Sequence, residues 1–118
     1  MTRDEIMKLE GKNLDASIAV LVMGWELDGD ASGDYWEKSR YDHIDFLEWK
    51  PSENIAHAWQ VVEKFYSAHI NRFGGSNGGK YYDVYMVTEI DGKNADGQVT
   101  DTTAPLAISR AALLAVLT

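Results

Sequence analysis

The run from Tyr81 to Ile90 is the feature that most constrains how this chain can fold. Its sequence, YYDVYMVTEI, is rich in aromatic and β-branched residues, which favour a β-strand. Alternation would place Tyr82, Val84, Met86, Thr88 and Ile90 on one face, and Tyr81, Tyr85 and Val87 on the other. Because both faces are largely apolar, we predict a central strand that is covered on both sides.

Helical signals stand on either side of this strand. Thr2 and Glu5 have the spacing of a capping box, which predicts a short helix that runs to about Glu10. Asn13 is a suitable cap for a second helix, and Gly24 suits the position just after its end.

The helical pattern that is easiest to see begins after Pro51, with Ser52 as its N-cap. Apolar residues at helical spacing predict a helix that ends near Arg72. A last helix is predicted from the capping residues Thr102 or Thr103, with Pro105 in its first turn. The apolar stripes of these two helices predict that Trp59, Val62 and Leu113 lie in the core.

The remaining segments have weaker patterns. A loop is predicted around residues 29–33 from Gly29, Asp30, Ser32 and Gly33, and one or two short strands from there to Trp49. The pairs Asp91-Gly92 and Asp96-Gly97 mark turns or loops, and 98–100 can pair back as a hairpin.

The element order α, α, β, β, α, β, β, α predicts an α+β fold, in which a small antiparallel or mixed β-sheet is layered with helices. A length of 118 residues fits a single domain over residues 1–118.

The chain has no cysteine, which favours a reducing cytoplasm. The longest apolar run, 18–23, is too short to span a bilayer, and the acidic N-terminus has no secretion signal.

The charge balance argues against two classes of partner. The chain has 19 acidic residues against 11 Lys and Arg, which gives a formal net charge of −8. Nucleic acid and anionic membrane surfaces both require a basic patch, so we expect neither as a partner.

Residues 74–80, GGSNGGK, match the phosphate-binding pattern G-x-x-x-x-G-K. In nucleotide hydrolases that loop follows a strand and opens a helix, and a Ser or Thr after the Lys holds magnesium. Here a helix is predicted before the glycines and a strand after them, and the residue after Lys80 is Tyr81. We therefore predict no nucleotide triphosphatase activity. The loop is either a plain helix-to-strand connection or a segment that folds over a ligand.

Metal and catalytic sites are not expected either. The stretch DGDASGD, residues 28–34, resembles half of a calcium loop, but Ser39 stands where a bidentate Glu is required. His57 and His69 are too far out of phase on one helix to share a metal. No nucleophile stands in a recognisable catalytic setting, and we expect no catalytic residue and no cofactor.

The aromatic residues at element borders are either core edges or a stacking platform for a planar ring. Combined with the glycine loop and a helix N-terminus, they give a hypothetical site for a nucleotide-like ligand. Its candidate residues are Trp49, Arg72, Asn77, Lys80, Tyr82 and Thr103.

Three blocks resemble the phage ABA sandwich domain family: NLDASIAVLVMGW, PSENIAHAWQVVEKF and DTTAPLAISRAALLAV, of which the third is the most specific. They cover about a third of the chain and leave out residues 28–45 and the 74–79 loop. The resemblance implies an α/β/α layered fold and a bacteriophage origin, and it implies no catalytic residues.

A phage origin suggests a function directed at host defences. The leading expectation is a non-enzymatic small-molecule binder that sequesters a nucleotide-derived immune signal in the host bacterial cytoplasm, as a homo-oligomer. The alternatives are a protein-interaction module that blocks a host protein, an accessory protein of structural role, and an enzyme of unknown chemistry.

Overall fold

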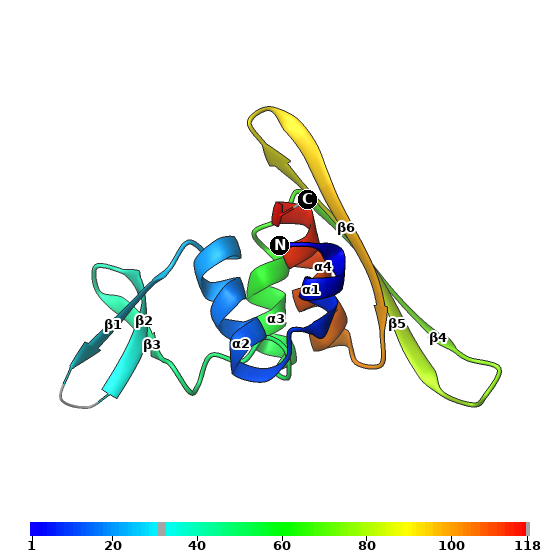
Figure 1. The fold of residues 1–118 in the computed structure, drawn as a ribbon, viewed down its shortest axis with the longest axis horizontal. Helices are drawn as coiled ribbons and strands as arrows, with labels where there is room; N and C mark the ends of the chain where they lie inside the picture. Colours follow the sequence, from blue (N-terminus) through cyan, green and yellow to red (C-terminus); the bar gives the residue numbers. More distant parts are fainter. Residues whose placement is uncertain (31–32, 118) are drawn as a thin grey trace.

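The computed structural model describes residues 1–30 and 33–117. In this part of the chain, a layer of helices lies between two three-stranded antiparallel sheets (Figure 1). The predicted α+β class, with antiparallel sheet layered with helices, is confirmed. The elements in chain order are α1 (Arg3–Lys8), α2 (Gly11–Ser17), the π-helical η1 (Ile18–Val22), β1 (Glu26–Asp30), β2 (Gly33–Ser39), β3 (Asp42–Asp45), α3 (Ile55–Val62), β4 (Ser67–Gly74), β5 (Lys80–Ile90), β6 (Lys93–Asp101) and α4 (Ala104–Leu117).

Local capping chemistry sets the N-terminal helices. The predicted capping box is present, because the Thr2 hydroxyl accepts the Glu5 amide and the Glu5 carboxylate accepts the Thr2 amide. The helix ends at Lys8, earlier than predicted, and Glu10 rather than Asn13 is the N-cap of α2. Gly24 follows the end of η1 with a φ of +73°, the left-handed conformation that glycine adopts at low cost.

The smaller sheet has the order β1-β2-β3, where we predicted a loop and one or two strands. The glycines predicted to mark a loop instead lie in paired strands, with Gly29 opposite Asp34 and Asp30 opposite Gly33. Ser32 of that predicted loop lies outside the described residues. Trp36 of β2 is buried in the core and Ile44 of β3 packs against the core. The Trp36 ring lies 5.8 Å, between centroids, from the ring of Phe46, which follows β3.

The predicted helix from Ser52 to Arg72 is wrong at both ends. Asn54 caps α3, with its side-chain oxygen 3.0 Å from the His57 amide. The helix ends at Val62, and residues 67–74 form strand β4. Of the three predicted core residues, Val62 and Leu113 are buried, whereas Trp59 is 51% exposed, so its assignment to the core is wrong.

The larger sheet has the order β4-β5-β6, so the prediction that the Tyr81 strand is central is confirmed. Asp91 and Gly92 form the two-residue turn between β5 and β6, with φ values of 52° and 77°, as hairpin turns of this length require. The pair Asp96-Gly97, predicted as a loop, lies inside β6.

The sheet is covered on one face only, which corrects the prediction that the central strand is covered on both sides. Val84 and Met86 of β5 are fully buried against α4, while Tyr85 between them is exposed. Figure 1 shows the helices on one side of this sheet and none on the other.

Candidate functional site

The glycine loop is the tip of the β4–β5 hairpin, and its amides are largely occupied within the loop. The Gly75 amide donates to the Gly79 carbonyl at 2.7 Å, and the Gly78 amide donates to the Gly75 carbonyl at 3.0 Å. The Gly79 amide donates to the Asn77 side-chain oxygen at 2.9 Å. Amides that are bonded in this way are not available to cradle a phosphate.

At Gly75 and Gly79, a larger residue would meet the ring of Tyr81. A Cβ on Gly75 would lie 2.5 Å from the Tyr81 ring, and a Cβ on Gly79 would lie 3.3 Å from it. The same ring stacks on Phe73 at 5.8 Å between centroids, and its hydroxyl accepts the Asn77 side-chain amide at 3.2 Å. The loop therefore closes over an aromatic pair of its own hairpin, and it joins two strands rather than a helix and a strand.

The hairpin does bring four predicted site residues onto one element. Arg72 is opposite Tyr82 in the register, Lys80 is opposite Gly74, and Asn77 lies in the tip between them. The other two predicted site residues, Trp49 and Thr103, lie elsewhere in the fold, so the six do not form one site.

Trp49 is fully buried and cannot stack on a ligand. Its ring meets Trp25 edge-on at 4.5 Å between centroids, stacks on His57 at 5.2 Å, and its Nε1 donates to the Asp15 carbonyl at 3.2 Å. These contacts join α2 and the residue before β1 to α3, so Trp49 is a core residue.

Asp15 lies at the same junction, and its carboxylate accepts the buried Ser52 amide at 2.9 Å. Burial raises the pKa of the Asp15 carboxyl above 3.8, because charge is poorly solvated there, although the bond from Ser52 acts in the opposite direction. A raised folded-state pKa means that this group stabilises the fold most when it is protonated. That contribution is complete below the unfolded pKa and is lost as the pH rises through the folded one.

We therefore expect Asp15→Asn to be at least as stable as the parent at pH 7, because the amide oxygen still accepts from Ser52 without a buried charge. The advantage should shrink as the pH falls toward 4. Asp15→Ala is the control, since it leaves the Ser52 amide unsatisfied at a cost of about 1–3 kcal/mol. Urea midpoints at pH 7 and pH 4 measure both effects, and a clear loss for Asp15→Asn at pH 7 would contradict this account.

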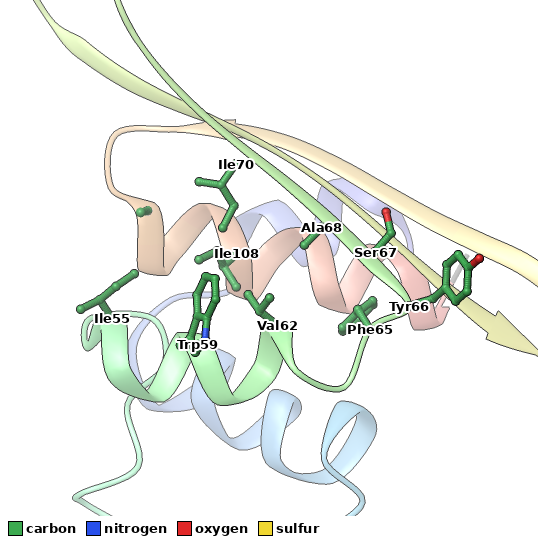
Figure 2. A pocket seen from close by; sticks show the side chains of 10 residues that line it. Ile55, Trp59, Val62, Phe65, Tyr66, Ser67, Ala68, Ile70 and Ile108 are labelled. Carbon is green, nitrogen blue, oxygen red and sulfur yellow. The ribbon is translucent and has the colours of Figure 1, made fainter.

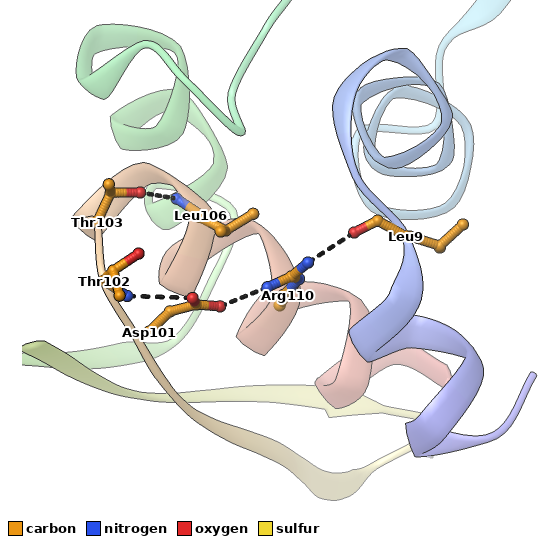
Figure 3. A network of polar contacts seen from close by, with 6 residues as sticks. All are labelled: Leu9, Asp101, Thr102, Thr103, Leu106 and Arg110. Carbon is orange, nitrogen blue, oxygen red and sulfur yellow. Dashed lines mark hydrogen bonds and ion pairs between the residues drawn. The ribbon is translucent and has the colours of Figure 1, made fainter.

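Of the two predicted capping residues, Thr102 and Thr103, it is Thr103 that is the N-cap of α4. Its hydroxyl lies 3.4 Å from the Leu106 amide, and its carbonyl accepts the Ala107 amide. Just before it, Asp101 accepts from the Thr102 amide and pairs with Arg110, which also reaches the Leu9 carbonyl (Figure 3). Thr103 thus caps the N-terminus of α4, which is a structural role.

A concave surface lies elsewhere, between α3, the start of β4 and the start of α4. It is a groove of about 570 Å³ (Figure 2). Its wall consists of Ile55, Trp59, Val62, Phe65, Tyr66, Ser67, Ala68, Ile70, Ala104 and Ile108. Apart from the Ser67 hydroxyl and the polar atoms of Trp59 and Tyr66, every lining side chain is apolar, and none is a Lys or Arg. We call this surface the α3–β4 groove.

Sequence reasoning missed this groove because it placed Trp59 in the core. The helical stripe does identify Trp59 and Ile55 as neighbours on one face of α3. That face is apolar, yet Trp59 and Ile55 remain 51% and 54% exposed, because the chain leaves α3 as a strand and not as a longer helix. Exposed large apolar side chains that line a concavity are typical of a binding surface.

Trp59 is the one exposed indole among the four tryptophans, all of which lie in the described residues. Trp25, Trp36 and Trp49 are at most 7% exposed. Because acrylamide reaches exposed indoles, we expect Trp59→Phe to remove most of the quenching of tryptophan fluorescence by acrylamide. Because the Trp59 side chain is half exposed, we expect Trp59→Ala to change the free energy of unfolding by less than about 1 kcal/mol. Quenching that persists in Trp59→Phe, or a large loss of stability, would show that the indole is buried.

The structure offers neither a metal site nor a membrane span in the part of the chain that it describes. Within residues 1–30 and 33–117, no three His, Asp or Glu side chains gather as metal ligands. The helices found in these residues are too short or too polar to cross a bilayer.

Comparison with known proteins gives one family. The family model described as phage ABA sandwich domain matches residues 16–113, and this span includes the 28–45 segment and the glycine loop. No curated protein matches the chain.

Proposed function

The chain belongs to the phage ABA sandwich domain family, a family of bacteriophage proteins, and on that premise we propose that it is a non-enzymatic binder of small molecules with a planar ring. The observation that carries the proposal is the α3–β4 groove with its half-exposed Trp59. A volume of about 570 Å³ lies within the range of small-molecule sites, which are mostly apolar with a few polar groups.

The ring of the ligand stacks on the Trp59 indole in this proposal. Stacking of a base on an aromatic side chain contributes roughly 1–3 kcal/mol and tolerates different bases. Ala104 is both a groove residue and the first residue of α4, so the groove ends at the N-terminus of a helix. The positive end of the helix dipole there favours an anionic group.

A nucleotide-derived molecule has both features, a planar base and an anionic part. Sequestration of such a signal in the host cytoplasm, without cleavage, is the form of this function that suits a phage protein. It also requires no catalytic group, which agrees with the character of the groove.

Calorimetric titration with cyclic ADP-ribose species and cyclic dinucleotides tests the proposal. We expect binding by the parent, a loss of affinity of at least tenfold in Trp59→Ala, and chemically unchanged ligand by chromatography afterwards. Lys80→Ala, on the hairpin tip, is the matched control and should bind like the parent. If Lys80→Ala loses binding and Trp59→Ala retains it, the ligand binds at the glycine loop and not in the α3–β4 groove. A ligand that is chemically converted during the titration would favour an enzyme.

A second candidate is a protein-interaction module that blocks a host protein. It is favoured by Tyr66, a residue of the groove wall that is 84% exposed and extends the apolar surface beyond the groove. No binding of any nucleotide, together with a host protein retained by the parent and lost by Trp59→Ala, would support this function instead.

A further inference from the structure

Strand β4 has a free edge whose backbone groups can be identified. The Gly75 amide donates to the Gly79 carbonyl in the same register as the β4–β5 ladder. Because paired residues of antiparallel strands alternate between bonded and non-bonded, His69, Asn71 and Phe73 direct their backbone groups toward β5. The groups of Ala68, Ile70, Arg72 and Gly74 therefore point away from the sheet.

The opposite edge of this sheet follows the same alternation and has a partner. Ile90 and Lys93 close the two-residue turn, so the odd-numbered residues of β6 bond to β5. Gln98 consequently faces outward, and its carbonyl accepts from the Arg3 guanidinium of α1 at 3.1 Å. No comparable contact to the outward groups of β4 is recorded among the described residues.

Strand β4 also differs from the other five described strands in charge. The sequence SAHINRFG contains no acidic residue, whereas each other strand has at least one. The other edge strands, β1, β3 and β6, carry Glu26, Asp28, Asp30, Asp42, Asp45, Asp96 and Asp101. Charged side chains, proline and bulges protect edge strands from pairing, but β4 has Arg72 as its one Lys, Arg, Asp or Glu residue, no Pro and no break in its register. In a chain of net charge −8, β4 is thus the edge that a second copy can approach without facing acidic side chains.

We propose that β4 pairs antiparallel with β4 of a second copy about a two-fold axis at Asn71, and that each copy thereby places its Arg72 at the rim of the other copy's α3–β4 groove. In this register Ile70 is opposite Arg72 of the second copy, and Ala68 is opposite Gly74. All four outward residues of each strand are used, in about eight main-chain hydrogen bonds. A register centred on Arg72 would instead oppose two like charges, which is destabilising.

The register of the β4–β4 pair determines on which face of the sheet the Arg72 side chain of the second copy lies. Residues directly opposite in antiparallel strands point to the same face of the sheet. The Ile70 side chain lines the groove, so Arg72 of the second copy stands beside it on the groove side. It supplies the cation that the groove of a single chain lacks. The role of Arg72 in ligand binding rests on the proposed function, whereas the dimer itself does not.

The dimer is tested without any ligand, by light scattering of the full chain. We expect a mass of about twice 13.2 kDa for the parent. Ile70→Lys sets Lys against Arg72 of the second copy and should give the monomer mass, and Ile70→Lys with Arg72→Glu should restore the dimer. Ile90→Lys is the matched control, since Ile90 is 41% exposed and Ile70 is 39% exposed in the same sheet, and it should remain dimeric. A monomeric parent, or a dimeric Ile70→Lys, would overturn the proposal.

A titration with ADP-ribose then tests Arg72. In the dimer, Arg72→Ala should weaken binding at least fivefold and remove most of its dependence on salt, since an ionic contact is screened and a stacked ring is not. Trp59→Ala should lose binding but keep the dimer mass. A dimer in which Arg72→Ala binds with the affinity and salt dependence of the parent would overturn the placement of Arg72 and leave the groove function standing. If Trp59→Ala and Arg72→Ala both bind ADP-ribose like the parent, the groove function and the placement of Arg72 are both overturned.

Discussion

Gly97→Ala is expected to destabilise the protein by about 3 kcal/mol or more, at the upper end of the range for overpacked cores. Gly97 is buried in β6, where the strand crosses α4. A Cβ there would lie 2.8 Å from the Ala115 amide nitrogen and 2.9 Å from the Leu114 Cβ, and it would also collide with the Ala111 carbonyl. These are mostly backbone atoms of a helix, which cannot turn aside as a flexible side chain can.

Relief of this contact requires α4 to move away from the sheet. Met86 of β5 and Val99 of β6 are buried, and both strands pack against the same helix. Separation would expose this apolar surface to water, at about 25 cal/mol for each Å². The free energy of unfolding of such a domain is only about 5–15 kcal/mol, so the loss is a large part of it.

Urea unfolding followed by circular dichroism measures the effect. Gly74→Ala is the matched control, because a Cβ at Gly74 meets only the Gly79 carbonyl at 3.8 Å, an ordinary contact. It should lie within about 0.5 kcal/mol of the parent. Equal midpoints for Gly97→Ala and the parent would mean that β6 does not pack directly on the backbone of α4.

Sequence patterns predicted the elements that are determined locally. The Thr2–Glu5 capping box, the Asp91-Gly92 turn and the N-cap of α4 at Thr103 each depend on a few adjacent residues. Local signals of this kind do not depend on which elements pack together, so one sequence was enough to find them.

Strand β4 shows where such patterns fail. In SAHINRFG, Ile70 and Phe73 are three apart and extend the apolar stripe of α3, so helical periodicity predicted a longer helix. The alternative is pairing with β5, in which Ile70 is opposite Val84 and Phe73 is opposite Tyr81. Long-range pairing overrides local propensity in strands, and no sequence window that contains β4 alone includes its partner.

The same error explains why the six predicted site residues do not come together in the fold. A helix to Arg72 would have made the glycine loop a helix-to-strand connection with free amides and would have buried Trp59. With β4 as a strand, the loop becomes a hairpin tip that satisfies its own amides, and Trp59 is left exposed on a shorter helix. The groove is formed by α3, β4 and α4 together, and this arrangement depends on tertiary packing.

Asp101→Asn is expected to destabilise the protein by about 3–5 kcal/mol, the usual cost of breaking a buried ion pair by removing one partner. The Asp101 Oδ2 and Arg110 Nη1 atoms are 2.6 Å apart, and the two side chains are only 14% and 11% exposed. Arg110 also donates to the Leu9 carbonyl at 2.9 Å, so one guanidinium joins the end of β6, the body of α4 and the end of α1 (Figure 3). Without the carboxylate, a buried positive charge has lost its counter-ion.

A second ion pair in the same chain is the control. Lys38 and Asp42 are 3.6 Å apart, and the Asp42 side chain is 62% exposed. Exposed pairs of this kind contribute about 0–1 kcal/mol and are screened by salt. Asp42→Asn should therefore have a small effect on the urea midpoint that disappears in 1 M NaCl, whereas the loss in Asp101→Asn should remain.

Removal of both charges separates the cost of an unpaired charge from the value of the pair. In Asp101→Asn with Arg110→Met, no buried charge is left alone, so the double variant should be more stable than Asp101→Asn by itself. In both variants the amide side chain at position 101 still offers an oxygen to the Thr102 amide, which keeps the turn into α4 the same. A double variant whose loss equals the sum of the two single losses would show that Asp101 and Arg110 act independently and that the pair does not hold these three elements together.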